Sequence, residues 1–358
     1  MANMIKKFIG TICLGAMLLS LTSCNASQEA ADNTAEQTKA PAKTEAAADT
    51  AAKTSAADDV SADPDASQYE FQISDEGAGI MSYNGDGGTV AIPETLGGKP
   101  VVSIGKKAFS GREDITEIII PDTVTTIGDF AFSNCTSLAK ATIPDSVISI
   151  GSYAFAKTGL TEITVPEGTT TVGIDTFSGC EKLKSIEADP SNPIYYSEDG
   201  VLFARASKAL VQYPGGKDDT AYTVPDGIER IAADAFAGNK LLTEVTLPQS
   251  LAVIGGSAFC ECISLKKIAI PALVQEIGTS TFMDCTSLAS VSMEGVYIIG
   301  YAAFNGCKDL TEVSLPDTVN AIDETSFGEC EKVQFSYRGK TYGYNDWDSM
   351  IADISASQ

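Results

Sequence analysis

The sequence predicts a repeat solenoid that is mostly β with short turns or 3-10 segments and is capped at both ends. Phenylalanines recur about every 23 residues, a similar apolar pattern surrounds each of them, and 31 Gly with 14 Pro indicate many turns. A fixed period in this range is typical of repeats that bury their apolar faces by stacking on one another. The marking positions are Phe109, Phe132, Phe155, Phe177, Phe236, Phe259, Phe282, Phe304 and Phe327.

The copy at residues 131–151 shows what each position of the repeat does. The stretch that ends at Ile143 places apolar residues two apart, which is the period of a half-buried strand. Pro144 then ends the strand because it lacks a backbone donor. A second extended piece ends in a turn after Ile150, and the Ala-Phe pair of each copy fills the inside of a coil.

These motifs, Ile-Pro, then Ile-Gly, then Ala-Phe, recur in register and resemble the BspA-like class of leucine-rich repeats found in bacterial surface proteins. The resemblance covers most of residues 69–346. It implies a curved solenoid with short parallel strands on one face, and a role in adhesion or surface interaction.

The first 23 residues are expected to be a lipoprotein signal peptide. Two lysines precede an apolar run from Phe8 to Leu21, which is typical of a secretory signal and too short for a membrane span. The run ends in Leu-Thr-Ser before Cys24, which resembles the bacterial lipobox. By that resemblance the Cys24 thiol carries diacylglycerol after cleavage, and the chain is exported, lipid-anchored to the bacterial cell membrane and exposed at the cell surface. The alternative is an ordinary signal peptide with a chance cysteine at its end.

Residues 24–66 are expected to be the lipidated cysteine followed by a disordered tether. The stretch is rich in Ala, Thr and acidic residues and has no aromatic residue, so it cannot bury a core. The solenoid is expected to occupy residues 67–358, with an N-terminal cap at 69–107 and a C-terminal cap at 331–358.

Each predicted cap contains a pair of extended segments. Residues 69–73 and 80–83 form the first pair, and residues 333–337 and 340–344 flank Arg338-Gly339 in the second. Trp347 is expected to cover the last coil, since the open end of a stacked core must be shielded. A ligand platform made by Trp347 with Tyr337, Tyr342 and Tyr344 is the alternative interpretation.

A longer step between Phe177 and Phe236 predicts an insertion at about 187–220. Asp199-Gly200 lies between apolar runs, which is the signal of a β-hairpin turn. We therefore expect an inserted β-hairpin with a loop at the rim. The favoured interpretation is structural, and the alternative is a specificity loop that uses Tyr195, Tyr196 and Tyr213.

Composition argues against several classes of function. The chain has no histidine, which removes the commonest general base, the Ser-His and Cys-His pairs and every imidazole metal site. Its net charge of -24 repels phosphate backbones, so nucleic acid is not an expected partner. No catalytic residue, cofactor or metal is expected.

Six of the nine cysteines occupy one repeat position, three residues after the phenylalanine. Other copies hold Arg112, Thr158 or Asn239 there, so the position is interpreted as an inward one, filled by buried thiols that pack and weakly hydrogen-bond. Disulfides are chemically allowed in an exported protein, but side chains that point the same way rarely reach the required torsion. Cys260 and Cys262 lack the spacing of a zinc site.

Outward positions on the first strand of each repeat supply the candidate binding residues. Charges alternate along them as Glu117, Lys140 and Glu162, and again as Glu244 and Lys267. Cross-strand ion pairing is a sufficient structural reason for the pattern. The functional interpretation is a shallow polar strip that holds an extended extracellular protein or a glycan.

These observations predict a lipid-anchored cell-surface binding protein presented on a flexible tether. The alternative is a structural envelope protein without a soluble ligand.

Overall fold

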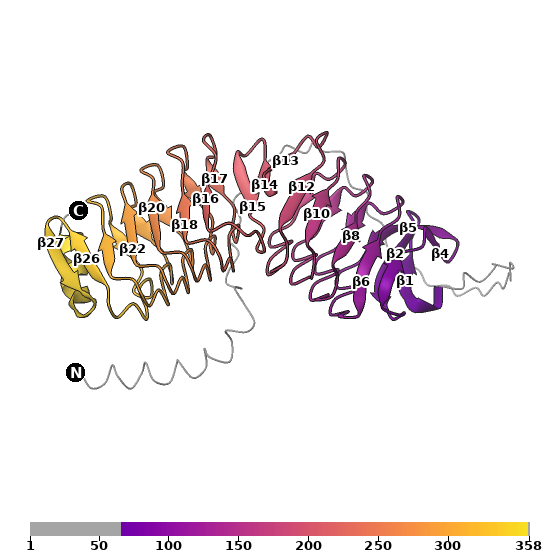
Figure 1. The fold of residues 1–358 in the computed structure, drawn as a ribbon, viewed down its shortest axis with the longest axis horizontal. Coiled ribbons are helices and arrows are strands. Elements are labelled where there is room, and N and C mark those ends of the chain that lie inside the picture. The colour runs from indigo at the N-terminus through magenta and orange to yellow at the C-terminus, as the bar shows by residue number, and fades with distance from the viewer. Residues whose placement is uncertain (1–65, 357–358) are drawn as a thin grey trace, which may run out of the picture. The chain divides into compact units, whose positions relative to one another are not determined.

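The computed structural model describes residues 66–356. The expected signal peptide, Cys24 and the expected tether up to residue 65 lie outside the described residues, as do residues 357–358. The described part belongs to the second of two compact units, Val60–Gln358. It confirms the predicted repeat solenoid, in which short parallel strands stack from coil to coil (Figure 1).

The first strand of each coil precedes the proline position. These first strands pair in parallel with their counterparts in neighbouring coils, within three sheets. They are β3 (Gly88–Ala91), β6 (Ile115–Ile119), β8 (Lys140–Thr142), β10 (Glu162–Val165), β12 (Ser185–Ala188), β16 (Ala221–Thr223), β18 (Glu244–Thr246), β20 (Lys267–Ile270), β22 (Ser290–Met293), β24 (Glu312–Ser314) and β26 (Gln334–Tyr337).

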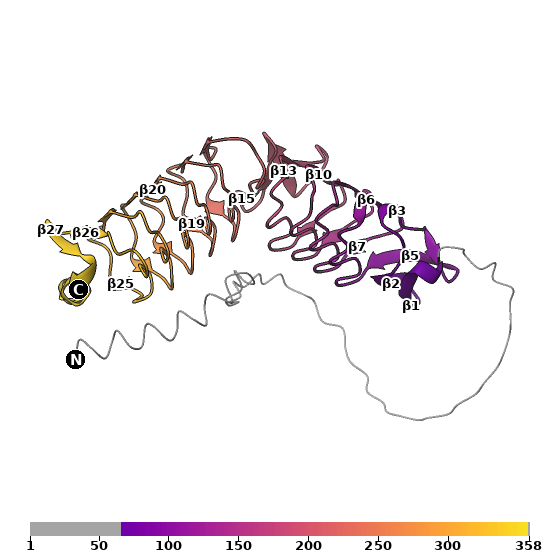
Figure 2. The same cartoon turned by 60° about the horizontal axis from the view of Figure 1, so that its bottom comes forward.

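The second strand of each coil follows the Val-x-x-Ile pattern and is mostly two residues long. In these strands the isoleucine usually points inward, as Ile127 and Ile277 do, while its neighbour faces out. They are β5 (Lys99–Ile104), β7 (Thr126–Ile127), β9 (Ser149–Ile150), β11 (Thr171–Val172), β17 (Arg230–Ile231), β19 (Val253–Ile254), β21 (Glu276–Ile277), β23 (Ile298–Ile299) and β25 (Ala321–Ile322) (Figure 2).

Both ends of the stack are covered by antiparallel pairs. At the start, η1 (Ala66–Gln68) leads into β1 (Tyr69–Ile73), which pairs with β2 (Ala78–Tyr83), and β4 (Thr95–Leu96) pairs with β5. At the end, β26 turns back into β27 (Lys340–Gly343), followed by η2 (Tyr344–Asp346) and helix α2 (Trp347–Ser355). Met350 and Ile354 of α2 belong to the core, and the half-buried Trp347 packs against it. Sequence patterning did not predict this helix.

The insertion holds three antiparallel strands rather than the expected pair. Strand β13 (Tyr195–Glu198) pairs with β14 (Val201–Ala204), and Asp199-Gly200 makes the turn with both φ angles positive, at 51° and 74°. A second reversal leads from β14 into β15 (Ala209–Gln212), which then pairs in parallel with β17. The residues of that second reversal, 205–208, carry no Asn-Gly or Asp-Gly signal, so the sequence did not reveal it.

A ladder of phenylalanine rings forms the centre of the core. Ring centroids of successive coils lie 5.0 Å apart for Phe109 and Phe132, and 5.2 Å apart for Phe282 and Phe304, with nearly parallel planes in the latter pair. Offset stacks at this spacing are favourable beyond the area that they bury. The ladder explains why the large ring recurs at one position of the repeat.

Candidate interaction surface

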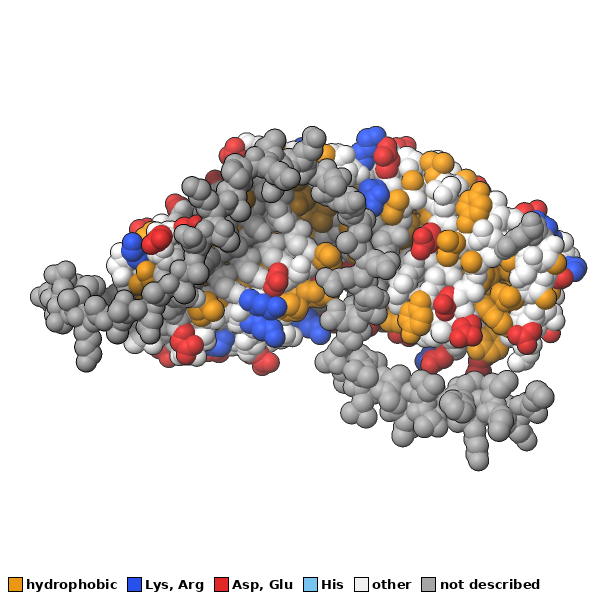
Figure 3. Space-filling view, turned by 180° about the vertical axis from the view of Figure 1, so that it is seen from behind, with side chains coloured by type: hydrophobic (Ala, Val, Ile, Leu, Met, Phe, Trp, Pro, Cys, Tyr) orange, Lys and Arg blue, Asp and Glu red, His pale blue; other side chains and the backbone are white. Residues whose placement is uncertain are grey.

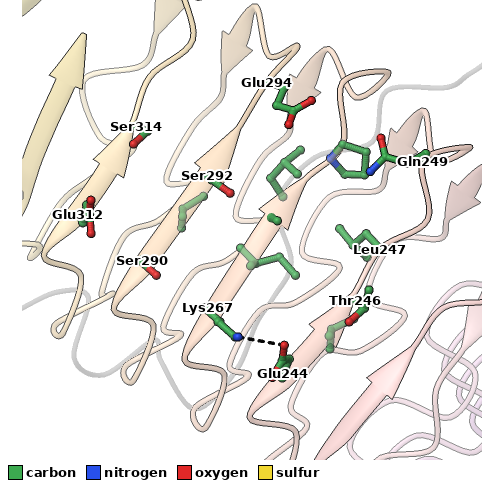
Figure 4. A pocket seen from close by; sticks show the side chains of 16 residues that line it. Glu244, Thr246, Leu247, Gln249, Lys267, Ser290, Ser292, Glu294, Glu312 and Ser314 are labelled. Carbon is green, nitrogen blue, oxygen red and sulfur yellow. Dashed lines mark ion pairs between the residues drawn. The ribbon is translucent and has the colours of Figure 1, made fainter. Parts of the chain in front are cut away.

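A shallow groove lies on the outward side of four first strands, β18, β20, β22 and β24, and has a volume of about 530 Å³ (Figure 4). Strand geometry fixes which side chains line it, because successive residues point to opposite faces. Val245, Ile268, Val291 and Val313 point into the core and are buried. Their neighbours on each strand face the groove.

The floor of the groove is made of small side chains. Thr246, Ala269, Ser292 and Ser314 occupy the outward position of successive strands, and all four are exposed. Parallel pairing sets Ala269 opposite Ser292 and Ser292 opposite Ser314. A flat floor that offers hydroxyl groups suits an extended segment that lies across the strands.

Three carboxylates and one ammonium group surround this floor. Lys267 points toward Glu244 on the adjacent strand, and its Nζ lies 3.1 Å from the carboxylate (Figure 4). Glu294 and Glu312 are exposed at the groove. With both members of the ion pair exposed, the pair contributes about 0–1 kcal/mol to stability. The groove therefore carries a net negative charge.

The corresponding strip near the N-terminal end contains the other predicted charges. Lys140 Nζ lies 2.8 Å from Glu117 across the β6–β8 pairing. The hydrogen bond from Lys140 lowers the pKa of Glu117, and the same bond raises the pKa of Lys140. Glu162 acts on Lys140 only through its charge. The predicted alternation thus produces two ion pairs rather than a continuous row.

The insertion tyrosines require a correction. Tyr195 and Tyr213 are 7% and 1% exposed, so neither ring is open to a partner. The Tyr195 hydroxyl oxygen accepts a hydrogen bond from the Val172 N–H (3.0 Å), and Tyr213 stacks on Phe236 with centroids 5.1 Å apart. The half-buried Tyr196 stacks on Phe203. Tyr213 thus fills the core position that the interrupted repeat leaves without a phenylalanine.

The repeated cysteines form a hydrogen-bonded row inside the solenoid. Each thiol donates to the carbonyl oxygen of the phenylalanine one coil earlier, as Cys135 does to Phe109 (3.1 Å) and Cys285 to Phe259 (3.0 Å). All seven cysteines of the described residues are free and buried. Burial raises the pKa of Cys135 to about 11 and that of Cys262 to about 12, so neither supplies a thiolate near neutral pH.

Sequence reasoning missed the role of Asn192. Its buried amide donates to the carbonyl oxygens of Pro166 (2.6 Å) and Thr169 (2.9 Å) in the preceding coil. Its oxygen accepts from the N–H groups of Ile194 and Tyr195. The available signal was an asparagine in the turn-forming run Asp-Pro-Ser-Asn-Pro, which indicates a loop without identifying a buried anchor.

Other chemistry is sparse in the described part of the chain. Residues 66–356 contain no group of three or more Cys, Asp or Glu side chains placed to hold a metal ion. No helix in that range is long and apolar enough to cross a membrane. A second hollow of about 500 Å³ has Lys182, Lys184 and Lys240 at its margin, where Lys184 and Lys240 pair with nearby carboxylates. On the face seen in Figure 3, acidic side chains are dispersed among hydrophobic and uncharged ones.

The BspA type leucine rich repeat region matches this chain in six copies, over residues 102–204 and 218–334. The chain belongs to this family. A match to the BspA type over most of the solenoid agrees with the observed strand, turn and phenylalanine pattern. No curated protein matches the sequence.

Solved structures of three bacterial proteins resemble the BspA-type solenoid. A leucine rich cell surface protein from Faecalibacterium prausnitzii is 28% identical with a TM-score of 0.57, over 78% of this chain and 95% of that one. A leucine-rich repeat protein from Eubacterium ventriosum is 23% identical with a TM-score of 0.60, over 75% and 82%. The pneumococcal vaccine antigen PcpA is 21% identical with a TM-score of 0.57, over 76% and 86%. The last two likenesses concern the fold alone.

Proposed function

We propose that this chain is a cell-surface binding protein whose groove on β18, β20, β22 and β24 receives an extended segment of an extracellular protein or glycan. The observation that carries the proposal is the flat, exposed floor of small and hydroxyl side chains, bordered by carboxylates. Repeat proteins use extended surfaces of this kind to bind partners. Membership of the BspA type and the likeness to a protein described as a cell surface protein support this role.

Enlarging one side chain on the floor tests the groove. Ala269→Arg places a long side chain between Thr246 and Ser292, and we expect it to weaken binding at least tenfold by blocking close approach. Ala252→Arg is the matched control, because Ala252 is also an exposed alanine but does not line the groove. Binding of the full chain to matrix proteins, mucins and glycans is measured for all three proteins.

Saturable binding that Ala269→Arg loses and Ala252→Arg keeps would place the partner in the groove. An equal loss of binding in both variants, or unchanged binding in both, would exclude the groove as the binding surface. Absence of any binding by the unsubstituted chain would favour the structural envelope role instead.

The lipid anchor is the second part of the proposed function. Two acyl chains bury enough methylenes for stable attachment, at about 0.8 kcal/mol per methylene. Cys24→Ser removes the acceptor thiol, so we expect the protein to move from the membrane fraction to the soluble fraction. The matched control is Cys13→Ser, which alters a cysteine inside the apolar run and should leave the fractionation unchanged. Membrane retention of Cys24→Ser would refute lipidation at this residue.

A further inference from the structure

The stack of coils changes its construction at the insertion coil, which we define as residues 183–216. Strand β12 pairs with β10 and does not pair with β16, so no sheet of first strands continues across this coil. The sheet of second strands likewise ends at β11, and a new sheet begins with β13, β14 and β15. The pairing is also interrupted between β8 and β10 and between β19 and β21, but there the other series of strands continues. Both series end only at the insertion coil, so the solenoid consists of two halves that meet at this coil.

The buried core is divided at the same place. Leu202 of β14 belongs to the core cluster that begins at Tyr69, whereas Val201 and Phe203 belong to the cluster that ends at Ile354. Alternate side chains of one strand thus face the two halves. Interactions that cross this junction set the free energy needed to open the contact between the two halves.

The turn before the aromatic position is two residues shorter in the insertion coil than in the next coil. At the start of the turn, Leu210 pairs with Ile231. At its end, the Tyr213 N–H donates to the Ala235 carbonyl oxygen. The Phe236 N–H makes the equivalent bond to the Ala258 carbonyl oxygen one coil later. Both ends of the turn are therefore in register. From Ile231 to Phe236 the next coil advances by 236 − 231 = 5 residues, whereas from Leu210 to Tyr213 the insertion coil advances by 213 − 210 = 3 residues.

The shorter turn brings two aspartates from the flanking coils into contact. Asp175 and Asp234 lie at the same position, two residues before the phenylalanine, and have positive φ angles of 55° and 56°. Their carboxyl groups lie within hydrogen-bonding reach of each other. Asp175 is only 7% exposed and Asp234 is half-buried. The other copies place Lys107, Phe130, Tyr153, Ser257, Ser280, Ala302 and Thr325 at this position.

A direct bond between two carboxyl groups requires a proton, because an ionised carboxylate can only accept. The free energy needed to remove this proton depends on the charged and polar groups around the pair. Tyr153 hydrogen-bonds to Asp175 from the preceding coil, and no lysine or arginine of the described residues contributes to the pKa of either aspartate. Gln212 of the insertion coil is neutral and donates to the Tyr213 and Ala235 carbonyls.

We propose that Asp175 and Asp234 form a proton-dependent clasp between the two halves of the solenoid, closed while the pair shares a proton and loosened when both groups are ionised. Burial, followed by the charge of Asp175, raises the pKa of Asp234 from 3.8 to about 7. Burial also raises the pKa of Asp175.

The direction of the pH effect follows from linkage. A group whose pKa is higher in the closed state than in the open state stabilises the closed state. This stabilisation is complete when the pH is below the pKa of the open state, and it is lost as the pH rises to the pKa of the closed state. The window therefore extends from 3.8 to about 7. Across it, the open population increases about tenfold for each pH unit.

Hydrogen exchange of the full chain at pH 5 and pH 7, corrected for the intrinsic pH dependence of exchange, measures this opening at residues 209–216 and 228–236. We expect the unsubstituted chain to open up to about 100-fold more at pH 7. Asp234→Asn supplies a permanent N–H donor to Asp175, so its opening should stay nearly constant. Asp122→Asn, at an exposed aspartate on an earlier coil, should retain the full pH response.

Three outcomes would overturn the clasp. The first is the absence of a pH response in the unsubstituted chain. The second is an equal response in the unsubstituted chain and Asp234→Asn, and the third is loss of the response in Asp122→Asn as well. If Asp234→Asn does not fold, Asp234→Ser takes its place, because serine occupies this position in the next two coils as Ser257 and Ser280. A response in Asp234→Ser equal to that of the unsubstituted chain would also refute the proposal.

Discussion

Replacing Phe282 with alanine lowers the free energy of unfolding by about 3–5 kcal/mol, the range for removal of a buried aromatic ring. Phe282 is fully buried and stacks on Phe259 and Phe304, with centroids 5.1 and 5.2 Å away. The alanine variant loses both stacks and leaves a cavity between two coils. Urea unfolding of the full chain, followed by circular dichroism, measures the change.

Phe282→Leu is the matched control for this prediction. Leucine keeps most of the buried apolar volume while it removes the ring, so its cost should be well below that of alanine. A loss below about 1 kcal/mol in Phe282→Ala would contradict a central role for the ring ladder, since that is no more than the removal of a single buried methylene costs.

Replacing Asn192 with alanine is expected to cost about 2–4 kcal/mol, because it leaves several buried backbone groups without a partner. The Asn192 side chain holds two carbonyl oxygens of the preceding coil and two N–H groups of its own loop. Unfolding by urea reports the loss, and hydrogen exchange should increase first at residues 192–198.

Ser191→Ala separates the amide's role from the general sensitivity of this loop. Ser191 is the preceding residue and its side chain is exposed, so its removal should change stability by less than about 0.5 kcal/mol. Similar losses in the two variants would show that Asn192 does not anchor the insertion to the preceding coil.

The regular part of the fold could be predicted because each repeat contains the same pattern of apolar residues and turn residues. Alternation around Ile118 and Val313 identified the inward side of the first strands, and the phenylalanine spacing identified the coil length. The Ile-Pro and Ile-Gly motifs marked where strands end. Repetition makes such a prediction robust, since one irregular copy does not hide the others.

The insertion could be located but not interpreted in detail. Asp199-Gly200 identified one turn, whereas the shortened turn before Tyr213 became visible only through its register with Ile231 and Ala235. The same limit explains the tyrosines. A tyrosine-rich loop looks like a binding loop in sequence, but Tyr213 occupies the position that phenylalanine holds in other coils.

The candidate groove was only partly predictable. The outward residues Glu244 and Lys267 could be read from strand alternation, and the structure places them 3.1 Å apart. Glu294 lies in a copy where the Ile-Pro motif is lost, so its position beside the groove required the three-dimensional stack.

The most direct test of the proposed binding role places a photoreactive amino acid at residue 292 of the full chain on intact cells, with residue 252 as the matched site. Both positions are exposed, but only Ser292 faces the groove. With extracellular matrix present, we expect covalent adducts to an external protein or glycan at residue 292 and few at residue 252. Equal adduct yields at the two sites, or adducts only to the cell's own envelope proteins, would contradict a binding function for the groove.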